Sequence, residues 1–384
     1  MRVLICVRRL DRGGSEMLEC RLARELTRMG IEAHLACQYS ASMEGQQEAA
    51  SRWIDEGVPA LHWLRMDTLV GKLRAVLTLR RLLNHFSFDI VLTSTLGTDV
   101  IAAIASRGLR TRHVVALHDY PPDSILSKVS VVIWRHALKF ADSFYSITDF
   151  VRHQTFLTLG IPLERNFIVH NSIELNSESF KSDRESIRNE LGLNLNARIL
   201  LYVGRIQYRK GCDILIEALA PKLVEWDASL ILVGPAFHQK ALEPGAIDYD
   251  EVISRKINQS PSPDRIKMIG WRDDVGKIMA SSDVLIHLAR HEGFGLVLLE
   301  AIASGIPVVA SNVGGIPEAL RGTPFTPVSL DDQEAIRSEV QRWLNMDDLT
   351  RRQYSEQAKQ VLDYYTDRRR ARDILRVLEE VVTR

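Results

Sequence analysis

Cysteine is scarce in this chain, because only four of its 384 residues are cysteines and no two of them form a C-x-x-C pair. Cys6 and Cys37 lie in short apolar stretches that are typical of strands. We therefore expect the cysteines to be reduced and mostly buried thiols. This cysteine usage indicates a cytoplasmic protein.

Long apolar runs are also absent. The N-terminal stretch MRVLICVRRLDRGG has too short an apolar run for a signal peptide, and no stretch reaches the ~18 apolar residues of a membrane span. We expect a soluble protein that at most touches the inner face of a membrane. An excess of one charge is missing too, since Lys plus Arg and Asp plus Glu both number 49. That balance gives no indication of a nucleic-acid partner.

Charge is nevertheless uneven in the segment 69–85. It contains Lys72, Arg74, Arg80 and Arg81 without an acidic residue, and leucines and valines recur between these cations. One interpretation is a basic amphipathic helix that anionic lipid attracts. The other, which we favour, is a helix that packs on the N-terminal sheet and keeps its cations in water.

Short β-branched stretches alternate with helical patterns along the chain, which predicts the α/β class, with parallel sheets that helices cover on both faces. The expected strands are residues 2–7, 33–37, 89–94, 113–118, 143–148, 167–171, 198–204, 229–234, 266–270, 283–289 and 306–311. A chain of this length suits two domains of roughly 150–200 residues.

The boundary between the domains is predicted near residue 178. Residues 171–186 are polar and without a period, which indicates a linker, and the pattern of strand, glycine-containing loop and helix then starts again. We expect domains of residues 1–177 and 178–365, with a surface loop at 237–252. The C-terminal tail predicts a charged amphipathic helix. Its apolar stripe consists of Ile374, Val377, Leu378 and Val381.

Two familiar phosphate-binding motifs are missing, since neither G-x-G-x-x-G nor G-x-x-x-x-G-K-[ST] occurs. No Asp-x-Asp pair is positioned to hold a metal, and the adjacent pairs Asp273-Asp274 and Asp331-Asp332 lie in polar loops. We expect both pairs to be solvated.

Ligands of open parallel sheets bind beyond the carboxyl ends of the strands, and four loops at such ends carry unusual residues. The first loop is RRLDRGGSEM, in which Gly13 and Gly14 allow close backbone approach and Ser15 is a candidate helix cap. The N-terminus of the following helix suits an anion. A plain capped turn is the alternative interpretation.

The second loop is VGRIQYRKGCD, where Arg205 and Lys210 lie between Gly204 and Gly211. Two cations at the end of a strand are suited to clamp a diphosphate. The alternative is that both are solvated surface cations. The third loop begins at His118, which ends an expected strand. A lone histidine is more often structural, but this position favours a function.

The fourth loop lies in HEGFGLVLLEAIASGIPVVASNVGGIPE, residues 291–318. Its glycines leave backbone N–H groups at the start of a helix, where they can face phosphate or sugar oxygens. Glu292 would accept hydrogen bonds from neutral hydroxyls. Glu300 lies in an apolar part of that helix, where a charge is costly to bury without a partner, and its carboxylate suits the vicinal diol of a ribose. Gly305 is the expected stop of the helix.

One ligand would use all four loops, namely a nucleotide diphosphate-sugar. The ribose would bind Glu300, the diphosphate would bind Arg205, Lys210 and the loop amides, and sugar hydroxyls would bind Glu292.

Together these residues resemble the retaining GT-B glycosyltransferases of family 4. The resemblance lies in GGSE at 13–16, HD at 118–119, VGRIQYRKG at 203–211, and the stretch 291–318 with its Glu-x7-Glu spacing. It covers nearly the whole chain and is much more specific in the C-terminal half. It implies two Rossmann-like domains that face each other across a cleft, with a final helix, residues 366–384, crossing back to the N-terminal domain.

The resemblance also implies roles for the two domains and their residues. Residues 1–177 would bind the acceptor and residues 178–365 the donor. Arg205, Lys210, Glu292 and His118 would be the catalytic residues. The resemblance further implies an enzyme that needs neither a metal ion nor a cofactor, with the cations in place of Mg²⁺. The residues expected to bind the donor are Gly13, Gly14, Gly204, Gly270, Trp271, Arg272, Gly293, Phe294, Gly295, Leu296 and Glu300.

The implied reaction moves a hexose-type sugar, with retention, from a nucleotide-sugar to an acceptor hydroxyl. The donor is expected to be a UDP-sugar, and the acceptor a glycan, a lipid-linked glycan or a small molecule. Front-face attack, with the β-phosphate oxygen as base, is favoured over a covalent intermediate on Glu292. Two other hypotheses stay open: a GT-B protein that binds nucleotide-sugars without transfer, and, less favoured, a GT-B epimerase.

Overall fold

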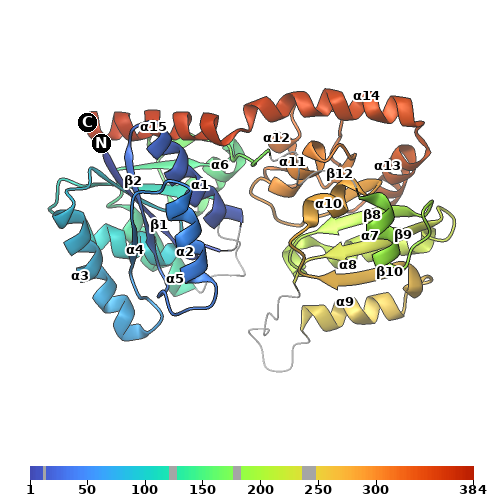
Figure 1. The fold of residues 1–384 in the computed structure, drawn as a ribbon, viewed down its shortest axis with the longest axis horizontal. Helices are drawn as coiled ribbons and strands as arrows, with labels where there is room; N and C mark the ends of the chain where they lie inside the picture. Colours follow the sequence, from blue (N-terminus) through green and yellow to red (C-terminus); the bar gives the residue numbers. More distant parts are fainter. Residues whose placement is uncertain (12–13, 121–127, 176–182, 236–247) are drawn as a thin grey trace. The chain divides into compact units, whose positions relative to one another are not determined.

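The computed structural model describes residues 1–11, 14–120, 128–175, 183–235 and 248–384. These residues form two compact units (Figure 1). Unit 1 comprises Met1–Ser172 and Tyr365–Arg384, and unit 2 comprises Ile173–Tyr364. The predicted boundary between residues 177 and 178 falls among residues outside the described ranges, a few positions after the observed division.

Unit 1 contains a parallel sheet of seven strands in the order β3-β2-β1-β4-β5-β6-β7. The strands are β1 Arg2–Val7, β2 Glu32–Cys37, β3 Leu61–Trp63, β4 Ile90–Thr93, β5 Arg112–Leu117, β6 Ser143–Ser146 and β7 Asn166–Ile168. Six of them were predicted, and β3 was missed because a half-buried strand of three residues at the sheet edge has too few residues to show alternation.

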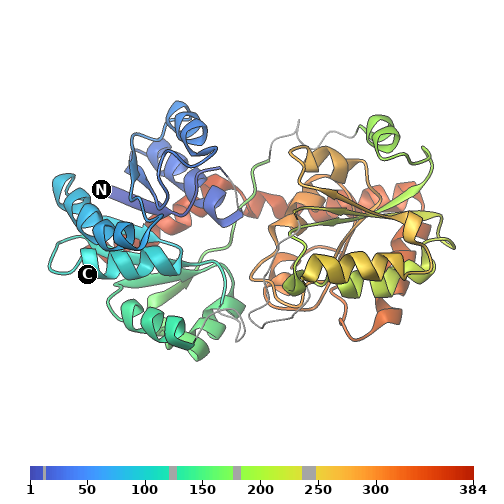
Figure 2. The same cartoon turned by 90° about the horizontal axis from the view of Figure 1, so that it is seen from below.

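Helices cover both faces of this sheet (Figure 2). They are α1 Gly14–Arg28, α2 Gln46–Asp55, α3 Leu69–His85, α4 Leu96–Ala105, α5 Lys128–Leu138, α6 Asp149–Leu159 and α15 Asp367–Thr383. Since successive side chains of a strand point to opposite faces, β1 contributes to two cores. Val3 and Ile5 pack with α1 and α15, whereas Leu4 and Cys6 pack with α3 and α4. A strand that is buried on both faces has to be apolar throughout, as this one is.

Helix α3 carries the basic segment 69–85. It packs on the sheet through Ala75, Leu79 and Leu83, as the favoured interpretation of this segment expects. Its four cations are exposed.

The last helix, α15, belongs to unit 1 although the chain reaches it from unit 2. It lies against α1 (Figure 1). The predicted stripe of Ile374, Val377, Leu378 and Val381 is buried in the core that β1 and α1 share. At roughly 1.5–3 kcal/mol for each fully buried aliphatic side chain, this stripe is sufficient to hold the helix on unit 1. The predicted return of the C-terminal helix to the N-terminal domain is therefore confirmed.

Unit 2 contains a parallel sheet of five strands in the order β10-β9-β8-β11-β12, all of them predicted. The strands are β8 Arg198–Val203, β9 Ala228–Val233, β10 Ile266–Gly270, β11 Val284–His287 and β12 Val308–Ala310. The helices are α7 Arg184–Glu190, α8 Cys212–Leu219, α9 Tyr249–Asn258, α10 Val275–Ala280, α11 Leu296–Ala303, α12 Ile316–Ala319, α13 Gln333–Asn345 and α14 Asp348–Lys359.

Two loop predictions in unit 2 are partly wrong. Residues 184–186 of the expected linker belong to α7, because Ile187 and Arg188 anchor this turn in the interior of the unit. Residues 249–252 of the expected surface loop open α9, where Tyr249 and Ile253 are buried one turn apart. The rest of that loop, 237–247, lies outside the described residues.

The strand order of each sheet indicates where a ligand-binding crevice is expected. The order reverses between β1 and β4 in unit 1 and between β8 and β11 in unit 2. The loops that leave the carboxyl ends of such strand pairs diverge to opposite faces, and this divergence opens a crevice in which ligands bind. In unit 2 these are the loops after Val203 and His287, which carry the candidate residues 204–211 and 288–295.

Candidate functional site

The centre of the candidate site is a three-residue contact at the carboxyl edge of the unit 2 sheet. Lys210 Nζ donates to Oε2 of Glu292 at 2.5 Å, and His287 Nε2 lies 2.9 Å from the same oxygen. The sequence places Lys210 and Glu292 82 positions apart, and the adjacent strands β8 and β11 bring them together. The side chain of His287 is 2% exposed and that of Glu292 is 13% exposed, so the contact is largely shielded from water.

Glu292 is ionised in this setting. Burial alone would raise the pKa of its carboxyl, but the Lys210 ammonium and the hydrogen bond from His287 outweigh burial and hold that pKa well below its ordinary value. Burial lowers the pKa of His287, although Glu292 opposes this shift. The ring is therefore neutral near pH 7, and Nε2 carries its proton because an ionised carboxylate can only accept.

Some hydrogen-bond donors and acceptors of these three residues are not used in the contact and are available to a ligand. Oε1 of Glu292 has no hydrogen-bond partner among the described residues and can accept from a hydroxyl. Lys210 has three N–H donors and uses one of them on Glu292, so two remain for an anion. A neutral hydroxyl and an oxyanion can thus bind side by side at this point.

A second ion pair, between Arg290 and Asp213, connects the loop that carries Glu292 with the segment that carries Lys210. Arg290 donates to both carboxylate oxygens of Asp213 at 2.7 Å, and Tyr249 donates its hydroxyl to Asp213 at 2.6 Å. The backbone N–H groups of Arg290 and His291 donate to the carbonyl of Arg209, at 2.8 and 3.2 Å. A bidentate arginine–carboxylate pair fixes orientation as well as distance, so the loop that carries Lys210 is held on the loop that carries Glu292.

Two glycines allow backbone segments to approach the site closely. A Cβ at Gly211, where φ is +67°, would lie 2.0 Å from the carbonyl oxygen of Leu288. A Cβ at Gly314, where φ is +62°, would lie 2.0 Å from the carbonyl oxygen of Glu292, and the next N–H, of Gly315, donates to that oxygen at 3.0 Å. Only glycine fits these positions, because both the backbone conformation and the space exclude a side chain.

Helix α11 begins beside this contact, as predicted. Gly295 precedes it with φ at +91°, and Leu296 is its first residue. The N–H of Leu298 donates back to the carbonyl of Gly295 at 3.0 Å, whereas the N–H groups of Leu296 and Val297 have no acceptor within the helix. The loop residues Gly293, Phe294 and Gly295 are buried. The predicted stop is confirmed, since Gly305 has φ at +78° and donates to the carbonyl of Ile302 at 3.0 Å.

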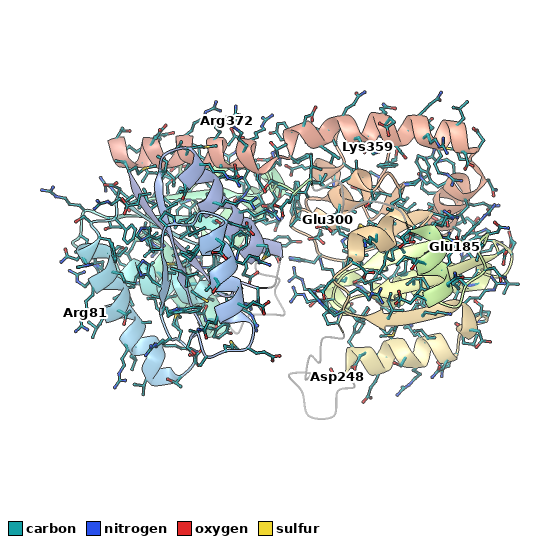
Figure 3. All side chains as sticks on the ribbon, in the orientation of Figure 1. Arg81, Glu185, Asp248, Glu300, Lys359 and Arg372 are labelled. Carbon is teal, nitrogen blue, oxygen red and sulfur yellow. The ribbon has the colours of Figure 1, made fainter. Side chains whose placement is uncertain are left out.

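Glu300 lies on α11 between buried apolar residues, and its own side chain is half-buried (Figure 3). The prediction of a ribose contact at this carboxylate stays a prediction. Arg205 is exposed, and its carbonyl accepts from the hydroxyl of Tyr202 at 2.9 Å, which ties the start of the loop to β8.

Residues 270–272, which were predicted to bind the donor, lie at the end of β10, whose last residue is Gly270. The carbonyl of Gly270 accepts from the N–H of Gly234 at 2.8 Å. Trp271 is 57% exposed, and its Nε1 donates to Asp273 at 3.1 Å. The Arg272 guanidinium is engaged by Asp274, at 2.8 Å, and by Glu190.

The glycine loop of unit 1 differs from its prediction in one respect. Gly14 is the first residue of α1 and is exposed, so Ser15 lies inside the helix and does not cap it. Its hydroxyl donates to Glu16 at 2.8 Å, which in turn accepts from Arg8. The helix starts two residues too early for a serine cap, since a cap at Ser15 would require Glu16 to be its first residue. Gly13 lies outside the described residues.

His118 directly follows β5, at the carboxyl edge of the unit 1 sheet, as predicted. Its Nε2 lies 2.8 Å from Oε1 of Glu19, a carboxylate on α1 whose side chain is fully buried. Arg370 of α15 donates to the same oxygen at 2.6 Å, and the hydroxyl of Tyr145 donates to it at 3.2 Å.

Sequence reasoning missed His287, Asp213 and Arg290 in unit 2 and Glu19 and Arg370 in unit 1. Two of them left a signal. His287 is a polar residue in an otherwise apolar strand, and Arg370 falls on the apolar stripe of its helix, four positions before Ile374. A polar group in an apolar pattern indicates a buried partner.

The described ranges contain no group of three or more His, Cys, Asp or Glu side chains arranged to hold a metal ion. The four cysteines are free and buried, as expected. Among the helices of the described residues, none combines the length and the apolar character that crossing a bilayer requires.

Two family models match this chain in succession. Residues 12–177 match the model described as Glycosyltransferase Family 4, and residues 183–361 match Glycosyl transferases group 1. Among curated relatives, N-acetyl-alpha-D-glucosaminyl L-malate synthase of Bacillus anthracis is 33% identical over 144 residues, 37% of this chain and 34% of that protein. Lipopolysaccharide glucosyltransferase WaaG of Escherichia coli is 33% identical over 166 residues, 41% of each chain. The matched part thus spans a third to two fifths of these relatives.

Solved structures match over nearly the full length. HepE of Anabaena, crystallised with UDP-glucose, superposes with a TM-score of 0.83 at 20% identity and covers 99% of this chain and 100% of its own. WaaG superposes with a TM-score of 0.69, also at 20% identity, over 98% of this chain and 99% of its own. At this identity the match establishes the fold of the chain.

Proposed function

Since the chain belongs to family 4 of the GT-B glycosyltransferases, we propose that it transfers a hexose-type sugar from a UDP-sugar to an acceptor hydroxyl with retention of configuration. The observation that carries this proposal is the buried contact of Lys210 and His287 with one oxygen of Glu292. It offers an anion site and a hydroxyl site side by side, as a sugar bonded to a diphosphate requires. A structural neighbour that holds UDP-glucose supports the choice of donor.

We assign the donor's parts to the residues of unit 2. The diphosphate would bind Lys210, Arg205 and the first N–H groups of α11, where the helix dipole favours an anion. The sugar hydroxyls would bind Oε1 of Glu292, and the ribose diol would bind Glu300. The base would bind backbone groups of residues 270–272.

The cations would act on the leaving group. As the bond between the anomeric carbon and the diphosphate oxygen breaks, negative charge grows on that oxygen, and Lys210 and Arg205 lie in the loop that would receive it. A fixed positive charge stabilises this state more than the ground state, which lowers the barrier. Glu292 would hold the sugar by its hydroxyls and not attack it.

Unit 1 would supply the acceptor side. We assign His118 to contact with the sugar or with the acceptor hydroxyl. The acceptor oxygen would bond to the anomeric carbon on the face that the diphosphate leaves, and its proton would pass to a β-phosphate oxygen. The acceptor class is a glycan, a lipid-linked glycan or a small molecule.

Donor binding and turnover test this proposal together. We expect UDP-sugars to raise the melting temperature more than GDP- and ADP-sugars do, and one UDP-sugar to release UDP when an acceptor pool is added. Thermal shift and a coupled nucleotide-release assay measure the two effects. Binding without UDP release would favour a sensor or scaffold protein, and a change of the sugar without transfer would favour an epimerase. No response to any UDP-sugar would contradict the proposed donor.

We further propose that α3 contacts the inner face of a membrane from the cytoplasm. Leu73 and Leu77 on this helix are 71% and 58% exposed, and the cations Lys72, Arg74 and Arg81 of the same helix are exposed too. Apolar side chains between cations are suited to anionic lipid, at about 1 kcal/mol per cation near the surface.

The double variant Leu73→Gln/Leu77→Gln keeps the charges of α3 and removes its exposed leucines. We expect it to lose at least half of the wild-type co-sedimentation with phosphatidylglycerol vesicles at low salt. Leu349→Gln on α14, at a leucine that is 69% exposed, is the matched control and should sediment like wild type. Absence of wild-type sedimentation would dismiss the membrane contact.

A further inference from the structure

The carboxylate of Glu19 is the centre of a buried polar cluster in unit 1. Its side chain has no exposure, yet it accepts from Arg370 at 2.6 Å, from Tyr145 at 3.2 Å, and lies 2.8 Å from Nε2 of His118. Arg370 is 3% exposed, and its other terminal nitrogen donates to the carbonyl of Leu18 at 3.0 Å. A charge that is removed from water to this degree persists only with such partners.

Glu19 is therefore ionised. Burial alone would raise the pKa of this carboxyl, but the Arg370 guanidinium and the hydrogen bond from His118 lower it to about 2. An ionised carboxylate accepts hydrogen bonds and donates none. It follows that Nε2 of His118 carries a proton whenever it faces Glu19.

That bond determines what the other ring nitrogen can do. Nδ1 of His118 is buried and has no hydrogen-bond partner among the described residues. With the proton on Nε2, Nδ1 of the neutral ring is a hydrogen-bond acceptor. It lies one residue beyond β5, at the edge of the sheet where ligands of this fold class bind. At this edge, Nδ1 would accept a hydrogen bond from a hydroxyl of the ligand.

We propose that Arg370 and Glu19 are positioning residues for His118: they hold its ring with the proton on Nε2 and present Nδ1 to a hydroxyl of the sugar or of the acceptor. The inference rests on the proposed function, since it needs His118 to contact the ligand. It gives α15 a role besides packing, because the cation that stabilises Glu19 comes from the last helix of the chain.

The first test reads the ring directly and needs no activity. Long-range proton–nitrogen spectra of protein labelled with ¹⁵N-histidine distinguish the two neutral forms, and His118→Gln identifies the signal among the 11 histidines. At pH 8 we expect His118 of the wild type to be protonated on Nε2. A proton on Nδ1 in the wild type would overturn the proposal without any further variant.

The second test removes the pair. In Glu19→Met/Arg370→Met both charges are lost together, so no single buried charge remains, and we expect the His118 signal to become a mixture of both neutral forms. The turnover number with the active UDP-sugar should fall at least about tenfold, the scale for residues that orient a functional histidine. Arg370→Lys keeps a cation for Glu19 and should restore the wild-type spectrum and part of the rate.

The control is Asp373→Asn/Arg376→Met, which removes a carboxylate–arginine pair at 3.2 Å from the exposed side of α15 and should change neither measurement. A folded Glu19→Met/Arg370→Met protein with the wild-type spectrum, or with a changed spectrum and the wild-type rate, would overturn the positioning role. If the wild type turns over no nucleotide-sugar, the proposed function fails, and the spectra still decide whether the pair holds the ring.

Discussion

Replacing Lys210 by methionine is expected to lower the rate of UDP release from the active UDP-sugar by at least about 100-fold, the scale for one lost donor to a developing oxyanion. Methionine keeps the length of the side chain and removes its charge. The loss should fall mainly on the turnover number, because the growing charge on the leaving oxygen is larger in the transition state than in the bound donor. Steady-state kinetics of nucleotide release measure it.

The same substitution at Lys222 is the matched control. Lys222 also pairs with a glutamate of unit 2, at 2.7 Å from Glu225, but this pair lies at the surface, with side chains that are 35% and 54% exposed. Exposed pairs contribute little, about 0–1 kcal/mol, and this one is not part of the candidate site. We expect Lys222→Met to turn over donor at the wild-type rate. Similar rates for Lys210→Met and Lys222→Met would refute the assigned role of Lys210.

Gly314→Ala is expected to disturb the site through the backbone of Glu292. The new Cβ would lie 2.0 Å from the carbonyl oxygen of Glu292, and the φ of +62° is itself unfavourable for alanine. The backbone conformation should cost about 1–2 kcal/mol of stability, and the displacement of a packed neighbour a further 1–3 kcal/mol or so. Because the displaced residue is Glu292, turnover should fall at least about tenfold as well.

Gly192 separates these effects, since it has the same φ of +62° and the nearest atom to its Cβ is Nζ of Lys267, at 3.7 Å, the far end of a flexible side chain. Gly192→Ala should therefore show the backbone cost alone and retain turnover. Urea unfolding and nucleotide release, measured on both variants, give the comparison. Equal losses of stability in the two variants would mean that the carbonyl of Glu292 moves away from the new Cβ without a cost in stability, and would contradict this prediction.

Those residues of the unit 2 site that lie in its loops could be predicted from the sequence. Lys210 and Glu292 each stand beside glycines at the end of an apolar strand, and this local pattern is visible without a structure. His287 was not predicted, although it contacts the same oxygen, because a histidine at the end of a buried strand is usually structural. Its partner becomes evident only when the loop after β11 folds back over it.

The buried clusters of the two units share one arrangement that the sequence does not show. In unit 2 an ionised carboxylate lies between Lys210 and His287, and in unit 1 Glu19 lies between Arg370 and His118. Arg370 and Glu19 are 351 positions apart in the chain. No local pattern relates residues at such a separation, so their pairing depends on where α15 docks.

The sequence alone determined the alternation of strands and helices, the division into two α/β units, the amphipathic last helix and the loops that contain the candidate residues. These depend on apolar periodicity and on glycine, which act over a few residues. Only the tertiary structure decided which charges meet: Lys210 with Glu292, Arg290 with Asp213, and Arg370 with Glu19. The physical reason is that strand order and helix docking, set by burial of whole faces, determine which distant side chains share a buried environment, and a buried charge is retained only where its partner arrives.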